Sequence, residues 1–156
     1  MNQSRSFLAA AALTAGSLAA IQVAMPPTAS IASPAMLVAN ATARVDFRSA
    51  QSPVRGGFKI RRVGTQRLIE LSGDFEAKDT APDLKIAFSP SRNPLANSKS
   101  PAYPLEEGSY TVLAPLRSSS GAQSYVIPSS IDLERQGSVL IWCELFNSTM
   151  GWAPLQ

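Results

Sequence analysis

The cysteine and histidine content limits the chemistry that this chain can perform on its own. Its 156 residues include one cysteine, Cys143, and no histidine. Without an imidazole, a single chain cannot build a Ser-His-Asp triad, a Cys-His pair, a histidine-bound zinc site or a haem site with the usual proximal histidine. One cysteine also excludes an intramolecular disulfide. The thiol of Cys143 is therefore the first candidate for redox chemistry.

Cys143 has three interpretations: a core residue, a reactive free thiol or a haem ligand. In an extended strand it shares a face with Ile141 and Leu145, and such apolar neighbours disfavour the thiolate and favour a core cysteine. On the opposite face of the strand, Trp142 and Glu144 indicate that this face is only partly buried. A reactive thiol needs exposure or a nearby cation. A haem iron would need a second axial ligand, which could only be Met150, another methionine, a tyrosine or an external group.

Several other residues have both a structural and a functional interpretation. Tyr125 could relay an electron or stack on a sugar, but a tyrosine at a strand start more commonly fills a core edge. Asp74 and Asp83 could form an acid pair, although turn chemistry is the simpler explanation for both. Trp142 is expected in the core or on a sheet face. The residues expected to set turn and strand-end geometry are Gly121, Pro128 and Gly151.

The charge balance does not indicate a nucleic-acid-binding protein. There are 14 Lys and Arg residues against 11 Asp and Glu residues, a net charge of +3, and the basic residues are scattered. The one local cluster is Lys59, Arg61 and Arg62. We expect this cluster to be a solvated strand face, with contact to an anionic surface as the alternative.

An uncharged stretch near the amino terminus predicts a cleavable signal peptide. Arg5 is the only charged residue before Arg44, and residues 7–25 carry no charge. Prolines then end the segment, and small residues favour cleavage after Ala32, with later candidate sites up to residue 43. We therefore expect a signal peptide over residues 1–32 and an exported, secreted or periplasmic protein that meets a membrane only through this segment during export. An uncleaved anchor is the alternative.

After Arg44 the sequence changes to short apolar runs with a period of two, separated by Gly, Pro, Ser and Asn. This pattern predicts about eight short strands in one all-β domain, an antiparallel β-sandwich or a related barrel. Residues 139–146 are expected to lie in one strand region. Residues 89–108 contain four prolines and no sustained period, so we expect one long surface loop.

Three segments, in order, resemble one known family. They are residues 71–88, 115–128 and 139–155. The positions that carry the resemblance are Asp74, Phe75, Pro82, Asp83 and Leu84 in the first segment, Gly121, Gln123, Tyr125, Ile127 and Pro128 in the second, and Ile141, Trp142, Cys143, Phe146, Gly151, Ala153 and Leu155 in the third. Together these segments resemble the DM13 domain, also called the electron transfer DM13 domain.

The resemblance implies an extracytoplasmic β-domain over residues 55–156, in the style of the DOMON-type sandwiches, with residues 33–54 as a short extension. It also implies that the single cysteine, here Cys143, is a redox centre that acts as a free thiol or as a haem ligand and serves an unknown redox partner.

The sequence departs from the family pattern at three places. A histidine is common in the family shortly after the position of Phe58, and this chain has none. Ala81 stands where a glycine is common, and Met150 replaces an aromatic residue. The missing histidine weakens the haem interpretation in particular.

Redox or electron-transfer chemistry at Cys143, with haem as the cofactor considered, is therefore the predicted function. The competing hypothesis is a non-catalytic binding or adhesion module in which Cys143 is only a core residue and the loops 89–108 and 117–123 contact a cell-envelope partner. A hydrolase has little support, because no histidine base or paired-carboxylate motif is present. An exposed Cys143 beside a cation or an apolar cavity would favour the redox hypothesis, and a sealed one would favour the binding module.

Overall fold

The computed structural model describes residues 42–156, so the predicted signal peptide and its favoured cleavage site lie outside the described residues. Within this part of the chain, no helix is long and apolar enough to cross a membrane. The strands are β1 (Val45–Asp46), β2 (Arg48–Ser49), β3 (Gly57–Val63), β4 (Gln66–Leu71), β5 (Leu84–Ser89), β6 (Thr111–Pro115), β7 (Gln123–Ile127), β8 (Ser138–Cys143) and β9 (Ser148–Pro154), with one 3₁₀ helix, η2 (Leu133–Arg135).

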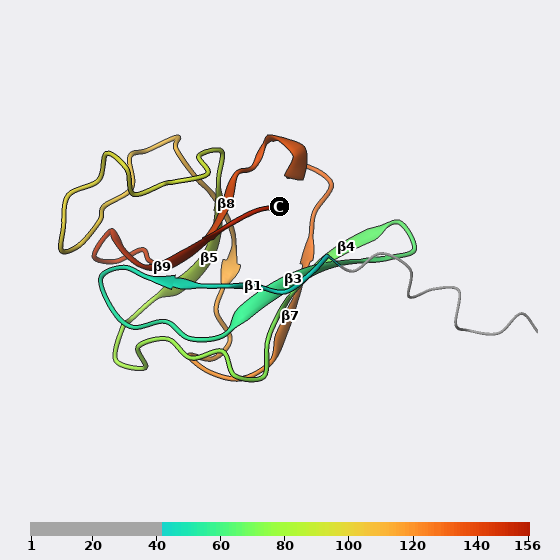
Figure 1. The fold of residues 1–156 in the computed structure, drawn as a ribbon, viewed down its shortest axis with the longest axis horizontal. Coiled ribbons are helices and arrows are strands. Elements are labelled where there is room, and N and C mark those ends of the chain that lie inside the picture. Colours follow the sequence, from blue (N-terminus) through green and yellow to red (C-terminus); the bar gives the residue numbers. More distant parts are fainter. Residues whose placement is uncertain (1–41) are drawn as a thin grey trace, which may run out of the picture. The chain divides into compact units, whose positions relative to one another are not determined.

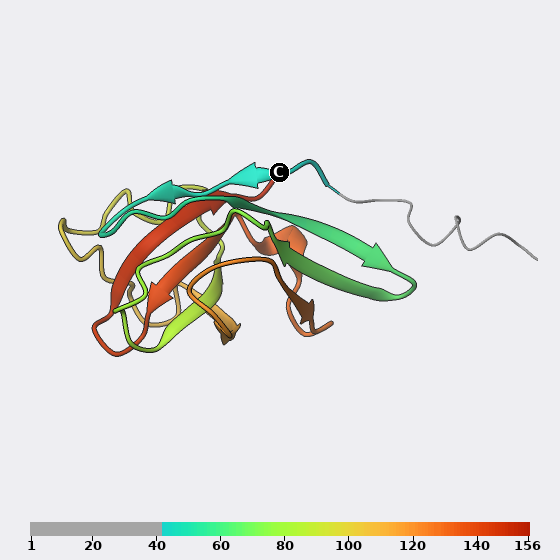
Figure 2. The same ribbon diagram turned by 90° about the horizontal axis from the view of Figure 1, so that it is seen from below.

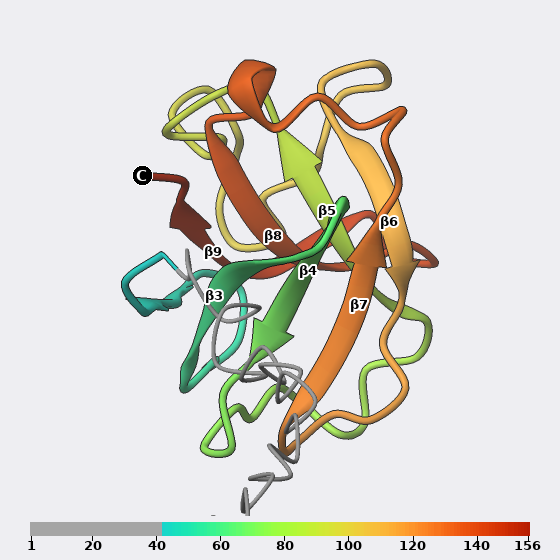
Figure 3. The ribbon, with the colours of Figure 1, turned by 90° about the vertical axis from the view of Figure 1, so that its right-hand side faces the viewer.

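The strands form two antiparallel sheets that pack face to face (Figures 1 and 3). The first sheet has the order β1-β3-β4-β7, and the second has the order β2-β9-β8-β5-β6. Side chains from both sheets meet in one inner core, to which Phe58 and Ile69 contribute from the first sheet and Ile86 and Ile141 from the second. The prediction of an all-β, antiparallel, two-sheet domain is therefore confirmed.

The segment between Val45 and Val54 joins both sheets. β1 pairs with β3 in the first sheet, whereas β2 pairs with β9 in the second. Phe47 lies between the two short strands, and its ring centroid is 5.5 Å from that of Phe58 and 5.9 Å from that of Phe75. Residues that the sequence analysis assigned to an extension thus supply a strand to each sheet and part of the inner core.

The strands β5, β8 and β9 of the second sheet are buried on both faces. Leu140, Trp142 and Trp152 point away from the inner core and form an outer core with Leu105. The irregular segment that includes Leu105 follows β5 and covers this face, on the side away from β3 and β4 (Figure 1). The expected irregular segment is present, but it is a cover for the sheet as well as a surface loop. Trp142 is 3% exposed, so the expectation of a partly buried face there is wrong.

Hydrogen bonds to β9 hold the covering segment in place. The backbone N–H of Thr149 donates to the carbonyl of Ala102 at 2.9 Å, and its hydroxyl donates to the carbonyl of Tyr103 at 2.7 Å. The hydroxyl of Ser148 also donates to Ala102, at 3.1 Å. The segment thus satisfies part of its backbone on β9 and part in local turns, such as the one in which the N–H of Ser98 donates to the carbonyl of Leu95 at 3.1 Å. A backbone held in this way needs no regular alternation of apolar residues.

The strand expected over residues 139–146 is shorter in the structure. β8 ends at Cys143, and a turn over residues 144–147 leads directly into β9. Leu145 and Phe146 lie in this turn and are 65% and 66% exposed. Leu145 therefore does not share the buried face of Cys143, and this part of the prediction is wrong because two apolar residues in a turn resemble a continuing strand.

Candidate functional site

Cys143 is the last residue of β8 and lies between two partners. It pairs with Leu84 of β5 and with Ser148 of β9. Its side chain belongs to the inner core and has 0% exposed surface. The expectation that the apolar face of β8 buries this thiol is confirmed.

The thiol has a defined hydrogen-bond partner. The Sγ atom donates to the carbonyl oxygen of Pro82 at 2.8 Å. Pro82 is placed there by the turn that precedes β5, in which Asp83 has a positive φ of 58°. The carbonyl of Asp83 also accepts from the backbone N–H of Glu144, at 3.2 Å, so this turn is attached to the end of β8. An aspartate tolerates such a conformation better than a β-branched residue does.

A small pocket opens beside the thiol. Its volume is about 240 Å³, and Cys143, Met150, Pro82, Phe146 and Lys78 are among the residues that line it. Cys143 and Met150 are both buried, so they form the base, whereas the exposed Phe146 lies at the rim. Cys143 has no water-accessible surface, so it contributes to the pocket wall without being reached by solvent in this conformation.

A β-bulge directs Met150 into the inner core. In the pairing of β8 with β9, Ile141 lies opposite Gly151 and Trp142 lies opposite Thr149, which leaves Met150 without a partner. Met150 is 3% exposed and belongs to the inner core, as Cys143 does. The structure thus brings together at one pocket the two residues that the sequence analysis considered for a haem site.

These residues do not fit a haem group in this conformation. The pocket, at about 240 Å³, is smaller than the range of about 300–1,000 Å³ typical of small-molecule sites, and haem is a large ligand. Thiolate ligation would also require an accessible sulfur, whereas the Cys143 thiol is buried and its hydrogen is donated to Pro82. Among residues 42–156, no group of three His, Cys, Asp or Glu residues is placed to hold a metal ion.

Acidic and basic groups near the end of β8 largely neutralise each other. The Nζ atom of Lys85 lies 2.7 Å from Oδ1 of Asp83 and 3.3 Å from Oε2 of Glu144. The hydrogen bond to Asp83 raises the pKa of Lys85, and the bond to Glu144 adds to it, against the opposing effect of desolvation. The carboxyl group of Asp83 is therefore engaged in an ion pair with Lys85. Among the residues that line the Cys143 pocket, the cation is Lys78.

Tyr125 is not among the residues of the Cys143 pocket. It lies on β7 in the first sheet, where its hydroxyl donates to Oε1 of Gln123 at 2.6 Å and accepts from the backbone N–H of Arg117 at 3.0 Å. The guanidinium of Arg117 lies 4.5 Å from the centroid of the tyrosine ring. These contacts fix the 117–123 loop against β7. Tyr125 therefore anchors this loop to the first sheet.

The remaining motif residues are spread over the domain. Gly121 has a φ of 84° and lies in the loop before β7, while the carbonyl of Pro128 accepts from Ile131 at 3.0 Å in the turn after β7. Gly151 lies inside β9 and not at a turn or strand end, so that expectation is wrong for this residue. Its missing side chain makes room for Val54. The ring centroid of Trp142 lies 4.7 Å from the ring centroid of Tyr110, which belongs to the covering segment. Cys143, Asp83 and Trp142 are close in the sheet, whereas Gly121, Tyr125 and Pro128 belong to the first sheet and its turns.

Asn147 has a structural role that the sequence analysis did not find. Its Oδ1 accepts from the indole N–H of Trp142 at 3.1 Å and from the backbone N–H of Leu105 at 2.9 Å, and its Nδ2 donates to the carbonyl of Leu105 at 3.0 Å. It has a φ of 42° in the turn between β8 and β9. An asparagine between two apolar runs is a turn signal, and this signal was available in the sequence.

Comparison with known proteins supports one family. Residues 46–155 match the family model described as "Electron transfer DM13". No curated protein matches the chain, and no solved structure does. The matched range covers both sheets and includes Cys143, Met150 and the pocket between them. This chain belongs to the electron transfer DM13 family.

Proposed function

We propose that this chain is an exported electron-transfer protein whose redox group is the thiol of Cys143. The family description supports a role related to electron transfer. The observation that carries the assignment to this residue is the pocket of about 240 Å³ with Cys143 and Met150 at its base. Cys143 is the only thiol of the chain, so a dithiol cycle within one molecule is excluded.

The chemistry that fits one thiol beside a small pocket is exchange with a disulfide outside the chain. The reaction is Cys143–SH + R–S–S–R → Cys143–S–S–R + R–SH. The Cys143 sulfur forms a new S–S bond and is oxidised, the departing sulfur is reduced, and it takes the proton that Cys143 loses. The oxidant is the external disulfide, and a second thiol reverses the reaction.

The closed geometry predicts that this exchange is slow. The S–H bond is held by the Pro82 carbonyl, and the sulfur has no accessible surface. A disulfide reaches it only when the turn carrying Phe146 or the turn carrying Pro82 moves. Phe146 is the more suitable point for a test, because it is exposed and forms part of the pocket rim.

The test is the rate at which hydroxyethyl disulfide, a small neutral disulfide, modifies the native protein, measured by mass spectrometry. We expect slow modification of the natural chain, several-fold faster modification of Phe146→Ala, and none of Cys143→Ser. Leu145→Ala is the matched control, because Leu145 is equally exposed in the same turn but does not line the pocket. If the natural chain and Phe146→Ala stay unmodified until they unfold, the proposal is wrong.

That negative outcome would favour a binding module. The full burial of Cys143 and the fixed position of the covering segment are the observations that support this second candidate. In it, the covering segment or the 117–123 loop contacts a cell-envelope partner, and Cys143 only packs. Mixed-disulfide formation in the native state separates the two candidates directly.

Export is part of the proposal and has its own support in the sequence. Residues 7–25 carry no charge and follow Arg5, as in a signal peptide. Expression of the full chain, followed by fractionation and amino-terminal sequencing, tests this point. We expect a processed chain outside the cytoplasm that begins between residues 33 and 44.

The two packed sheets also support the proposed likeness to DOMON-type sandwiches.

A further inference from the structure

The net positive charge of the described domain is concentrated in one hairpin. The β3–β4 hairpin spans residues 57–71 and carries Lys59, Arg61, Arg62 and Arg67 against one acid, Glu70. The other described residues, 42–56 and 72–156, carry nine Lys and Arg residues against ten Asp and Glu residues. The excess of positive charge therefore comes from this hairpin, which extends past the neighbouring strands (Figure 2).

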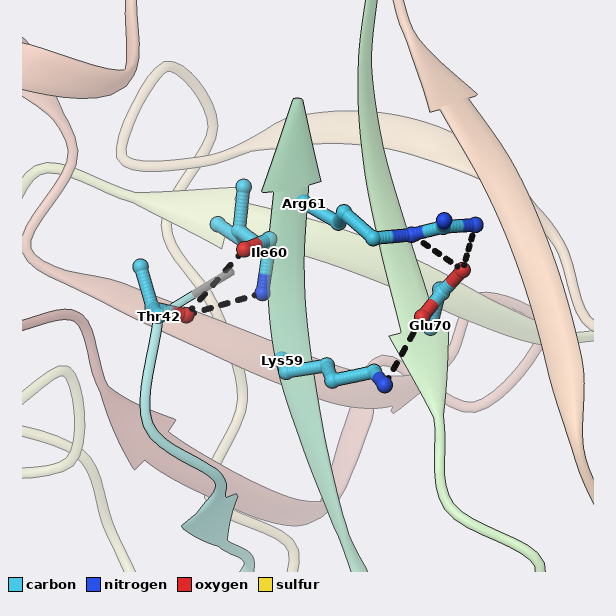
Figure 4. Close-up of polar contacts among 5 residues, drawn as sticks. All are labelled: Thr42, Lys59, Ile60, Arg61 and Glu70. Atoms are coloured by element: carbon cyan, nitrogen blue, oxygen red, sulfur yellow. Dashed lines mark hydrogen bonds and ion pairs between the residues drawn. The ribbon is translucent and has the colours of Figure 1, made fainter. Parts of the chain in front are cut away.

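The cations of the hairpin lie on both of its faces. Lys59 and Arg61 point to the outer face, where both pair with Glu70, at 3.3 and 2.7 Å (Figure 4). Arg62 and Arg67 lie directly opposite each other on the other face, and neither forms an ion pair within residues 42–156. Like charges in this position are unfavourable, so an anionic partner would stabilise the pair.

An apolar pair lies beside these cations on the outer face of the first sheet. Arg61 is opposite Leu68 of β4, and Leu68 is opposite Val126 of β7, so the three side chains form a row across the sheet. Neither Leu68 nor Val126 belongs to the inner or the outer core, and Val126 is 51% exposed. Cations beside exposed apolar side chains suit a bilayer interface, where anionic head groups border the acyl chains.

The described chain begins beside the same hairpin. The backbone N–H of Thr42 donates to the carbonyl of Ile60 at 2.9 Å, and the hydroxyl of Thr42 accepts from the N–H of Ile60 at 2.9 Å (Figure 4). Sixteen residues separate Thr42 from the uncharged stretch 7–25, and a chain of this length spans at most about 55 Å. The predicted leader, which meets the membrane during export, therefore joins the domain next to its most positive element.

The element next to the hairpin does not neutralise this charge. Asp132 and Glu134, at the start of η2, are balanced in number by Arg135 of the same helix and by Arg92, which lines a pocket with Glu134 and Arg135. The positive charge of the hairpin thus remains available to an external anionic surface.

We propose that the hairpin end of the first sheet docks on a membrane surface that contains anionic phospholipids. Arg62 and Arg67 contact the lipid phosphates, because a guanidinium donates several hydrogen bonds to one phosphate. Lys59 and Arg61 add to the positive potential that attracts the bilayer. The outer-face apolar row lies at the boundary between head groups and acyl chains.

This docking leaves the Cys143 pocket at the far end of the domain. Cys143 pairs with Leu84, the first residue of β5. Pro90, directly after the other end of β5, lines a pocket of about 480 Å³ together with Ile60 of the hairpin. The hairpin and Cys143 therefore lie at opposite ends of β5. The docking does not depend on the redox role proposed for Cys143.

The test is cosedimentation of the leader-free chain with vesicles of phosphatidylcholine alone and with vesicles of equal parts phosphatidylcholine and phosphatidylglycerol. Both sheets lie within residues 42–156, so the domain is complete without the leader. At low ionic strength we expect binding to the mixed vesicles to be about tenfold or more stronger. It should weaken as salt shortens the Debye length from about 10 Å at 0.1 M to about 3 Å at 1 M. Equal binding to both vesicles, or binding of poly-L-glutamate but not of the mixed vesicles, would overturn the proposal.

Variants test the assigned residues. Arg62→Gln/Arg67→Gln should bind the mixed vesicles about tenfold or more weakly, while its melting temperature stays unchanged or rises because the like-charge pair is removed. Val126→Ser should weaken binding severalfold.

Arg55→Gln/Lys99→Gln is the matched control, because it removes the same charge elsewhere. Arg55 precedes β3, at the end opposite the hairpin turn, and Lys99 belongs to the covering segment. We expect this control to bind the mixed vesicles as the natural chain does. Equal binding by the control and by Arg62→Gln/Arg67→Gln would contradict the assignment.

Discussion

At the scale of single residues, Asp74 shows how a local contact changes a titration. Nη2 of Arg44 lies 2.7 Å from Oδ2 of Asp74. This hydrogen bond, with a second one from Ser72, lowers the pKa of Asp74 to about 2. Because the pKa of the folded state is the lower one, the contribution to stability is present above about pH 4 and is lost as the pH falls toward 2.

The expected measurement is an NMR titration of the Asp74 carboxyl carbon. Its midpoint should lie at about pH 2 in the natural chain and move upward in Arg44→Gln. Ser72→Ala should move it upward by less, because Arg44 is the larger cause. Arg55→Gln should leave it unchanged, since Arg55 pairs with Glu76. An unshifted midpoint in Arg44→Gln would show that this contact is not formed in solution.

At the scale of elements, the β-bulge and its neighbour Gly151 set how β2 reaches β9. A β-carbon at position 151 would lie 2.8 Å from Cγ2 of Val54 and 2.9 Å from the carbonyl oxygen of Arg48. Rotation of the Val54 side chain would move Cγ2 but not Cβ, which lies 2.9 Å from the added carbon. The Arg48 carbonyl belongs to β2 and cannot move without weakening the pairing of β2 with β9.

Gly151→Ala should therefore destabilise the domain by about 1–3 kcal/mol, as overpacking of a core does. Gly73→Ala is the control, because no atom lies within 4 Å of the added carbon. We expect its effect to stay within about 0.5 kcal/mol. Urea unfolding followed by circular dichroism measures both. Equal stabilities of the two variants would mean that β2 can move away from β9 at little cost.

Much of the element pattern could be predicted from the sequence. In part of β3 and β4 apolar and polar residues alternate because one face is buried: Phe58 and Ile60 flank Lys59, and Ile69 and Leu71 flank Glu70. This alternation identifies the strands. The burial of both faces of β8 could not be predicted, because the residues that cover it come from an irregular segment that bonds to β9. The burial of Cys143 could be predicted from the apolar face of its strand. Its pocket could not, because the pocket depends on a turn whose apolar residues, Leu145 and Phe146, look in the sequence like a continuation of the strand.

At the scale of the whole molecule, β8 and β9 connect the two cores. Cys143 and Met150 face the inner core, while Trp142 and Trp152 from the same strands face the outer one. Neither core can lose its packing without disturbing strands that the other shares. We therefore expect both to unfold in one cooperative step, as small single domains usually do.

This expectation can be measured with two probes in the same urea series. Tryptophan fluorescence reports the outer core, because Trp142 and Trp152, the two tryptophans of the chain, both lie there. Reaction of Cys143 with a bulky aromatic disulfide reports the inner core, since the buried thiol is accessible to a large reagent only after unfolding. Coincident midpoints are expected. A thiol transition at lower urea would show that the inner core opens separately.

The pairing of β2 with β9 has a consequence for the time course of folding. Arg48 lies opposite Trp152, so one of the first strands of the described chain completes its sheet only with the last. The second sheet therefore cannot close until both β2 and β9 are available for pairing. Long-range pairing also slows closure afterwards, to the millisecond-to-second range of about 10⁻³–1 s typical of β-sandwiches. The second sheet is therefore expected to close late in folding.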